Sequence, residues 1–222
     1  MATSVVGVDD IKFKHPFTMK LAGNRRTGKT HFTKTLLLKN RELITPPIDS
    51  IIWFYASRQE DVFNEIESTL KHQRVQFIQG LPKQNTIQDT IERRHGRKLV
   101  VLDDLMEEAS NRSDVAALFT NGRHEDVSVI FLSQNLFHKG KYSRDISLST
   151  DYMVAFKNPR DSSTINNLGR QMGNAKFLQE AYRDATKDAF SHLFMDLRSD
   201  TSDALRYRSN VLDDVQKVYQ PL

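Results

Sequence analysis

The chain has 222 residues, of which 38% are hydrophobic and 27% are charged. A chain of this length and composition buries enough apolar surface to fold, which excludes wholesale disorder. Cysteine is absent, which excludes a disulfide scaffold, a thiolate zinc site and thiol catalysis together. No run approaches the roughly 18 apolar residues that span a bilayer, and the start, MATSVVGVDDIKFK, lacks the apolar stretch of a secretory signal. We therefore expect neither a transmembrane segment nor secretion.

The formal net charge is +4, and the charges are unevenly distributed along the chain. Residues 1–40 hold eight Lys or Arg against two Asp or Glu. The segment 138–144, HKGKYSR, holds three Lys or Arg and no acid. A mildly basic balance permits a polyanionic partner without requiring one.

Strands and helices alternate along the predicted chain. Short apolar runs between turn residues indicate buried strands, and apolar residues at helical spacing indicate helices. The predicted strands cover residues 17–22, 50–56, 75–79, 98–102, 127–133 and 151–156, with a terminal strand pair at 191–197 and 204–209. The predicted helices cover residues 30–40, 60–72, 113–120, 162–172 and 174–186.

This alternation predicts an α/β fold, with a mainly parallel sheet and helices on both of its faces. Because the pattern continues from end to end, we expect a single domain over residues 1–222. Its core is expected at about 13–172, followed by a C-terminal helix and strand extension at 173–222. The terminal strand pair is expected to form an added antiparallel edge.

A phosphate-loop pattern, G-x-x-x-x-G-K-[ST], lies between the first predicted strand and the first predicted helix. It consists of Gly23, Asn24, Arg25, Arg26, Thr27, Gly28, Lys29 and Thr30. Glycines let backbone N–H groups wrap around phosphate oxygens, and the helix that follows adds the positive end of its dipole. We expect Lys29 to reach the β- and γ-phosphates of ATP, and the Thr30 hydroxyl to bind Mg²⁺. The alternative is a surface glycine turn, against which the flanking strand and helix argue.

Two acids, Asp103 and Asp104, follow the predicted strand at 98–102. Such a strand places them at the carboxyl edge of the sheet, where ligands bind in open α/β folds. We expect Asp103 to hold Mg²⁺, through water, and Asp104 to orient or deprotonate the attacking water. Glu107 and Glu108 are rival bases, although a solvated helix start is the more usual role for such residues.

The spacing between these motifs also indicates a class of enzyme. Two predicted strands, 50–56 and 75–79, separate the phosphate loop from Asp103 along the chain. In many small-molecule P-loop kinases the acidic strand is the sheet neighbour of the loop strand. Here there is room for another strand between them, an arrangement that suits an NTPase whose hydrolysis drives motion.

Further polar residues precede and follow the predicted strand at 127–133. Gln134, just after it, is placed to contact the γ-phosphate or the attacking water, unless it only caps a turn. The loop beyond carries Lys139, Lys141 and Arg144, which are candidates to touch DNA phosphates without reading sequence. A solvated basic loop is the alternative reading of these three residues.

Arg123, before the same strand, is a candidate for an arginine that enters the site of a neighbouring subunit. An ordinary surface arginine is the alternative. Arg25 and Arg26 compete for the same role within one subunit, because they lie inside the phosphate loop itself.

Several longer stretches resemble the genome-packaging ATPases of the HerA–FtsK superfamily, in their poxvirus-like branch. The resemblance is strongest to those of Polinton-like and adintovirus-like elements and related DNA viruses. The stretches are FKHPFTMKLAGNRRTGKT, SIIWFYASRQ, KLVVLDDLM, LFTNGRHEDVSVIFLSQNLFHKGKYSRDISL and DYMVAFKNPRDSSTINNLGRQM. They span residues 13–172 in family order, and the tail through DAFSHLFMDLRSDTSDALRYRSNV also fits.

The resemblance implies a RecA-like additional-strand P-loop NTPase that uses ATP and Mg²⁺ to move double-stranded DNA into a preformed capsid. It implies a homo-oligomeric ring of five or six subunits, capsid proteins as partners, and a location in the virion or at the site of viral assembly. By position, Lys29 and Thr30 fall on the family's phosphate-loop residues, Asp103 on its magnesium aspartate and Gln134 on its sensor glutamine. Arg123 falls where related motors place an arginine that acts across the ring interface.

The sequence departs from the family pattern in two places. Arg25 and Arg26 occupy the middle of a loop that commonly reads Gly-x-Thr-Gly-Ser-Gly-Lys-Thr/Ser, which looks more like terminase-type packaging motors with an arginine in cis. Asp104 stands where a glutamate is usual, and it is one methylene shorter. Two other functions therefore stay open: a P-loop phosphotransferase acting on a small molecule, and a nucleotide-dependent interaction switch that does not hydrolyse ATP.

Overall fold

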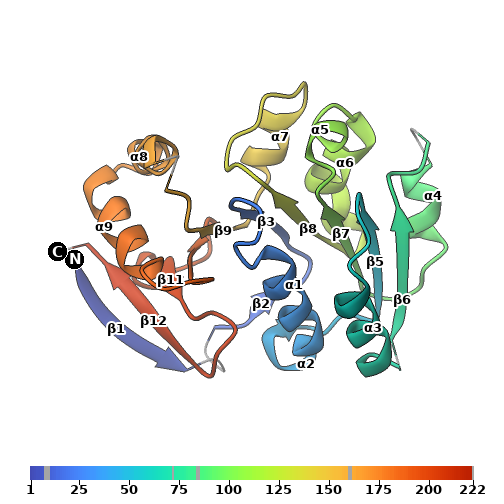
Figure 1. Cartoon of the computed structure of the whole chain (residues 1–222), viewed down its shortest axis with the longest axis horizontal. Coiled ribbons are helices and arrows are strands. Elements are labelled where there is room, and N and C mark those ends of the chain that lie inside the picture. The colour runs from blue at the N-terminus through green and yellow to red at the C-terminus, as the bar shows by residue number, and fades with distance from the viewer. Residues whose placement is uncertain (8–10, 72, 84–85, 160–161, 222) are drawn as a thin grey trace.

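The computed structural model describes residues 1–7, 11–71, 73–83, 86–159 and 162–221. The strands that it describes are β1 Ala2–Gly7, β2 Phe13–Lys14, β3 Thr18–Ala22, β4 Ile44–Thr45, β5 Ser50–Tyr55, β6 Arg74–Gln79, β7 Lys98–Asp103, β8 Val127–Ser133, β9 Tyr152–Phe156, β10 His192–Asp196, β11 Tyr207–Ser209 and β12 Val215–Gln220. Within these described residues, ten strands form one sheet in the order β1-β12-β11-β10-β9-β3-β8-β7-β5-β6 (Figure 1). The short strands β2 and β4 pair separately.

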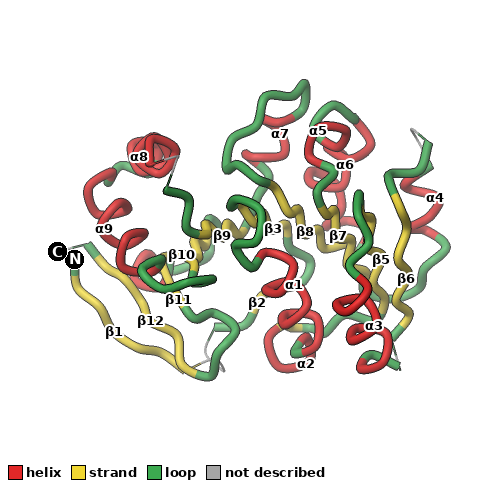
Figure 2. Tube along the Cα trace, viewed as in Figure 1, coloured by secondary structure: helices red, strands yellow, loops and turns green. Residues whose placement is uncertain are grey.

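The sheet has a parallel half and an antiparallel half. All strands from β9 through β3, β8, β7 and β5 to β6 run parallel. Strands β10, β11, β12 and β1 continue the sheet beyond β9 in antiparallel fashion, so the predicted terminal pair is present as β10 and β11. Strands β1 and β12 were not predicted, and their pairing brings the two ends of the chain side by side (Figure 2).

Helices cover both faces of the sheet, as Figure 1 shows. One face carries α1 Lys29–Leu38, α2 Asn40–Leu43 and α3 Glu60–Thr69. The other carries α4 Ile87–Glu92, α5 Met106–Ala109, α6 Ser113–Asn121, α7 Ser143–Leu148, α8 Ser162–Gln171 and α9 Ala175–Ala185. Two short 3₁₀ turns, η2 Gly122–Glu125 and η3 Asp203–Leu205, complete the described elements. This arrangement confirms the predicted α/β class.

Alternation of side chains along each strand explains the two layers. On β8, Ile130 and Leu132 join the core under α1 and α3, whereas Val129 and Phe131 join the core under α6. Every residue of β8 is buried, because a central parallel strand is covered on both faces.

The strand between the phosphate-loop strand and the acidic strand is β8. It pairs with β3 on one side and with β7 on the other. The additional strand expected from the sequence is therefore present, but it follows the acidic strand along the chain. The strands that precede it, β5 and β6, lie beyond β7, and the partly exposed β6 forms that end of the sheet.

The helices differ from their predicted bounds mainly at their ends. The helix predicted at 30–40 stops at Leu38 and is followed by the separate turn α2. The helix predicted at 60–72 stops at Thr69, and residue 72 lies outside the described residues. The short helices α4, α5 and α7 were not predicted. In the part of the chain that the structure describes, we find no helix with the length and apolar character needed to cross a bilayer.

Candidate functional site

The phosphate loop, residues 23–28, leaves the carboxyl end of β3 and leads into α1. Gly23 packs so tightly that an added Cβ would lie 2.7 Å from the Cβ of Phe156. Gly28 has φ +104° at the N-cap of α1, a conformation that favours glycine. Arg26 also has a positive φ of 62°. Alternation of backbone conformations of this kind turns consecutive N–H groups towards one point, which is how such loops bind phosphate.

The Lys29 ammonium closes the loop. Its Nζ donates to the carbonyl oxygens of Gly23 at 2.6 Å and of Asn24 at 2.8 Å. These contacts use two of its three N–H donors and leave one for a phosphate oxygen. Partial burial lowers the pKa of Lys29, and the nearby charges of Asp103 and Asp104 oppose that shift.

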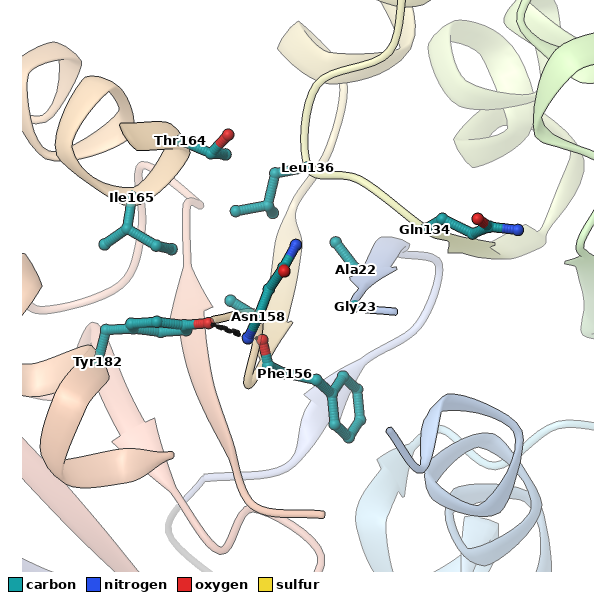
Figure 3. Close-up of a pocket in the computed structure, with 10 residues that line it drawn as sticks. Ala22, Gly23, Gln134, Leu136, Phe156, Asn158, Thr164, Ile165 and Tyr182 are labelled. Atoms are coloured by element: carbon teal, nitrogen blue, oxygen red, sulfur yellow. Dashed lines mark hydrogen bonds between the residues drawn. The ribbon is translucent and has the colours of Figure 1, made fainter. Parts of the chain in front are cut away.

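Residues after β9 brace the start of the loop. The side-chain amide of Asn24 donates to the Oδ1 of Asn158 at 3.0 Å. The backbone N–H of Asn158 donates to the Tyr182 hydroxyl at 2.8 Å, and that hydroxyl donates to the carbonyl of Phe156 (Figure 3). Helix α9 thus fixes the β9 end beside the loop through Tyr182.

Asp103 ends β7 with its carboxylate buried, at 6% exposure. Burial raises the pKa of Asp103 to about 6, although the nearby Trp53 indole N–H and the Lys29 charge oppose that shift. Trp53 Nε1 does not meet hydrogen-bond geometry, so Asp103 Oδ2 has no hydrogen-bond partner among the described residues. An unpartnered buried carboxylate oxygen is unfavourable unless a cation or a donor completes it. The orphaned oxygen, close to the charge of Lys29, is therefore what a cation-binding carboxylate requires.

Asp104 leaves the strand in a left-handed turn, with φ +57°, which aspartate tolerates better than most residues. The turn brings its exposed carboxylate to Gln134 at the end of β8, whose Nε2 donates to Asp104 Oδ1 at 3.1 Å. The structure therefore brings together the second acid and the glutamine that the sequence singled out. It does so because β7 and β8 are parallel neighbours that end at the same edge.

Gln59 also belongs to this site and was not predicted. Its Nε2 donates to the Thr30 hydroxyl at 3.3 Å. Gln59 follows β5, whose last residue, Tyr55, is paired with Asp103. Gln59 could have been identified from its position. It is a polar residue shortly after a buried strand, and other site residues lie at the same edge of the sheet.

The metal ligands available at this edge of the sheet are typical of a Mg²⁺ ion shared with phosphate, not of a metal bound by protein residues alone. Oxygens of Asp103 and Thr30 are hard ligands, and Mg²⁺ is usually held by one or two such groups together with phosphates and water. Among the residues that the structure describes, no group of three His, Cys, Asp or Glu could hold a metal. Asp103 and Thr30 are accordingly the residues that would hold the ion.

Arg123 lies at the opposite edge of the sheet from the phosphate loop. It is in η2, before β8, is 52% exposed, and pairs with the Asp151 carboxylate ahead of β9. The seven residues of β8 separate it from Gln134, a rise of about 20 Å at ~3.3 Å per residue. Arg123 therefore does not reach the site of its own chain, whereas Arg25 and Arg26 are exposed on the loop itself.

The two rival bases lie on α5, where both side chains are exposed. Glu108 pairs with Arg112 at 3.3 Å. Among the described residues, the backbone carbonyl of Glu107 accepts a hydrogen bond from the Asn111 side chain at 2.8 Å. Neither carboxylate contacts Gln134 or Lys29, so Asp104 is the acid that the fold places at the loop.

The basic residues Lys139, Lys141 and Arg144 are exposed on the segment that runs from Gln134 into α7. The start of that segment is anchored by Lys20 on β3, whose buried Nζ donates to the Leu136 carbonyl at 2.6 Å. Burial lowers the pKa of Lys20 to about 8. One continuous segment therefore connects the glutamine at the site to the basic surface.

Burial of the Asp103 carboxylate predicts how the stability of the protein depends on pH when nucleotide and Mg²⁺ are absent. We expect Asp103→Asn to raise the free energy of unfolding at pH 8. The folded pKa of about 6 exceeds the unfolded value of ~3.9, so the charge opposes folding above pH 6 and the opposition fades as the pH falls towards 4. The gain at pH 8 is on the order of 2–3 kcal/mol.

Urea unfolding of both proteins at pH 8 and pH 4.5 tests this, with the exposed Asp61→Asn as the matched control. The advantage of Asp103→Asn should shrink at pH 4.5, while the control should differ little from wild type at either pH. An advantage that is the same at both pH values would show that the buried charge is not its source.

Comparisons with known proteins bear on the family and the fold of the chain. The family described as "Poxvirus A32 protein" matches residues 9–180. No curated protein matches the chain. Among solved structures, the cytoplasmic domain of the Type VII secretion ATPase EccC of Thermomonospora curvata has a TM-score of 0.55 at 14% identity, over 91% of this chain and 25% of that chain.

Two other solved structures are less similar. The KaiC-like protein PH0186 of Pyrococcus horikoshii has a TM-score of 0.47 at 13% identity, over 98% of this chain and 100% of that chain. The ATPase DotB of Legionella pneumophila has a TM-score of 0.40 at 11% identity, over 79% of this chain and 54% of that chain. The family match covers most of the chain and includes the phosphate loop, both acids and Gln134, and it establishes that this protein belongs to the poxvirus A32 protein family of P-loop ATPases.

Proposed function

We propose that the chain is the subunit of a ring-shaped motor that uses ATP and Mg²⁺ to move double-stranded DNA into a viral capsid, at the site of virion assembly. One observation carries the proposal: the Gln134 amide donates to Asp104 at 3.1 Å, and the same segment continues to Lys139 and Lys141. A group beside the reacting phosphate is thus connected, within a few residues, to a surface suited to DNA phosphates.

The reaction proposed is hydrolysis of the γ-phosphate. A water oxygen attacks the γ-phosphorus, the bond from that phosphorus to the β–γ bridging oxygen breaks, and ADP and phosphate are released. Lys29 stabilises the β- and γ-phosphate oxygens, and Asp104 orients the water and accepts its proton, with Gln134 holding the carboxylate in place. Bound Mg²⁺, held by Thr30 and Asp103, would neutralise charge on the phosphate oxygens.

The geometry also supports coupling between hydrolysis and movement. Loss of the γ-phosphate changes the partners available to Gln134, which directly follows β8. The segment after it is held at Leu136 by Lys20 and is exposed beyond that point. A change at Gln134 would have to pass the anchored Leu136 to reach the basic segment, which begins two residues further along the chain.

Steady-state ATP hydrolysis across protein concentration, with and without linear double-stranded DNA, tests the proposal. We expect hydrolysis per subunit to rise cooperatively with protein concentration and to increase with DNA. Transfer of phosphate to a nucleoside or nucleotide would instead support a phosphotransferase. Tight ATP binding without turnover, in the presence of both DNA and capsid protein, would support an interaction switch.

The basic segment makes a separate prediction. In the triple variant Lys139→Ala, Lys141→Ala, Arg144→Ala we expect basal hydrolysis to persist and stimulation by DNA to be lost. The slope of log affinity for DNA against log salt should fall by about 2–3, because up to three phosphate contacts disappear.

Fluorescence titration of a DNA duplex at several salt concentrations measures that slope. A control triple variant of exposed basic residues elsewhere, Arg41→Ala, Lys71→Ala, Lys176→Ala, has the same change in net charge. If both triple variants weaken DNA binding equally, the effect is one of net charge and the segment is not a DNA contact.

A further inference from the structure

An apolar pocket of about 440 Å³ lies beside the phosphate loop, and no role has yet been given to it. Its lining comes from the loop and the start of α1, the end of β9, the turn before β10 and the first residue of β10, and a segment before β12. The lining residues are Gly28, His31, Phe32, Phe156, Phe190, His192 and Leu212. No lining side chain is an Asp, Glu, Lys or Arg. Such a lining suits an uncharged aromatic ring and does not suit a phosphate or a DNA backbone.

The order of the strands places this pocket on the side of the loop away from the acids. Asp103 ends β7 and Gln134 directly follows β8, both on one side of β3. Phe156 and His192 belong to β9 and β10, on the other side. Figure 3 shows the Phe156 ring close to Gly23, with the Gln134 side chain directed away from it.

This placement has a consequence for any nucleotide on the loop. If the γ-phosphate lies at the acids, as the proposed function requires, the rest of the molecule can extend across the loop towards β9 and β10. Four strand spacings of ~4.8 Å separate β7 from β10, about 19 Å. That span is comparable to the length of an extended nucleoside triphosphate, so the pocket is within reach of its base.

Phe190 is the unusual residue of the pocket. Its side chain is 68% exposed, and its backbone has φ +64°, which is unfavourable for a bulky residue. A Cβ added to Gly28 would lie 3.4 Å from the Phe190 Cβ, so the aromatic residue lies directly against the loop. A large exposed aromatic side chain in a strained turn, at the edge of a binding loop, is a feature typical of ligand sites.

His192 completes the wall of the pocket as a neutral ring. It packs edge-on against Phe32, with ring centroids 4.9 Å apart, and in a tilted arrangement against Phe156, with centroids 5.3 Å apart. Burial lowers the pKa of His192 to about 4, so the ring is uncharged at neutral pH. Neither ring nitrogen has a hydrogen-bond partner among the described residues.

We propose that this pocket, the base pocket, holds the purine ring of the nucleotide, with the Phe190 ring stacked on it. The proposal rests on the proposed function only in requiring that ATP binds the phosphate loop. Stacking of a base on an aromatic side chain is commonly worth about 5- to 100-fold in affinity.

Binding of two probes to the whole chain tests the base pocket: ATP, and inorganic tripolyphosphate, which has no base. In Phe190→Ala we expect the Kd for ATP to rise by about 5- to 100-fold and the Kd for tripolyphosphate to stay unchanged. Phe190→Tyr keeps an aromatic ring and should bind ATP as wild type does. Phe137→Ala, at the other described exposed phenylalanine, is the matched control and should bind both probes normally.

The outcomes separate this proposal from the proposed function. Equal weakening of ATP and tripolyphosphate would show that Phe190 only supports the loop, and it would overturn the base pocket. Unchanged ATP affinity in Phe190→Ala, with or without a change in assembly, would also overturn it. Failure of the wild-type chain to bind either probe would instead contradict the proposed function. Thermal unfolding of Phe190→Ala, expected near the wild-type temperature, shows that the variant is folded.

Discussion

Replacing Lys29 by alanine is expected to lower kcat for ATP hydrolysis by at least ~100-fold. The ammonium lies inside the loop, where it donates to two loop carbonyls and keeps a third N–H for a phosphate oxygen. In the alanine variant, the negative charge that develops on the β- and γ-phosphate oxygens lacks the Lys29 ammonium as its positive partner. The rate of hydrolysis is measured from the phosphate released. Single-turnover measurements separate the chemical step from product release.

A control on the same helix distinguishes this effect from a general loss of charge. Lys34, five residues further along α1, pairs with Glu65 at 2.7 Å and does not contact the loop. Lys34→Ala should retain hydrolysis within a few-fold of wild type. Lys29→Met, which keeps most of the side-chain stem, should be as inactive as Lys29→Ala. Substantial turnover in either Lys29 variant would rule out the proposed part played by the ammonium.

The second large effect concerns Arg123. We expect Arg123→Ala to lower kcat by about 10³-fold or more, the usual size of such an arginine's contribution. Arg123 lies at the other end of β8 from the site and pairs there with Asp151. We therefore expect any direct effect of Arg123 on hydrolysis to act on a neighbouring subunit.

Mixing two inactive variants tests that conclusion directly. Lys29→Ala subunits carry an intact Arg123, and Arg123→Ala subunits carry an intact loop. In a ring of both, some interfaces join an intact loop to an intact arginine, so activity should return on mixing. If activity does not return, and single alanine variants of Arg25 or Arg26 are also inactive, the arginine acts in cis.

Central strands were easier to predict from the sequence than edge strands. The runs at 50–56, 98–102 and 127–133 are continuous and apolar because both faces of the parallel half are covered. Strand β1 has no such pattern, and its Val5 is 72% exposed. It forms a strand because β12, more than 200 residues later, offers a hydrogen-bonding edge. Contacts so distant in sequence leave little local pattern.

The site residues likewise differ in how far a local sequence pattern identifies them. Lys29, Asp103 and Gln134 could be identified because each stands at a fixed position relative to a strand or to the loop motif. Gln59 and Phe190 carry no motif, and their relation to the loop follows from the packing of β5, β9 and β10. The order of strands was also undecided, since an additional strand was expected but its identity as β8 was not.

The sequence by itself determined the class of fold, the phosphate loop, the acid pair and the family, because these depend on periodicity and on residues close together in the chain. Only the tertiary structure decided which distant groups meet: Asp104 with Gln134, Thr30 with Gln59, and Gly28 with Phe190. It also decided that Arg123 lies away from the site of its own chain. The physical reason is that parallel strands bring their carboxyl ends to one edge regardless of their separation in sequence, and the strand order that selects the neighbours is set by burial of the whole sheet.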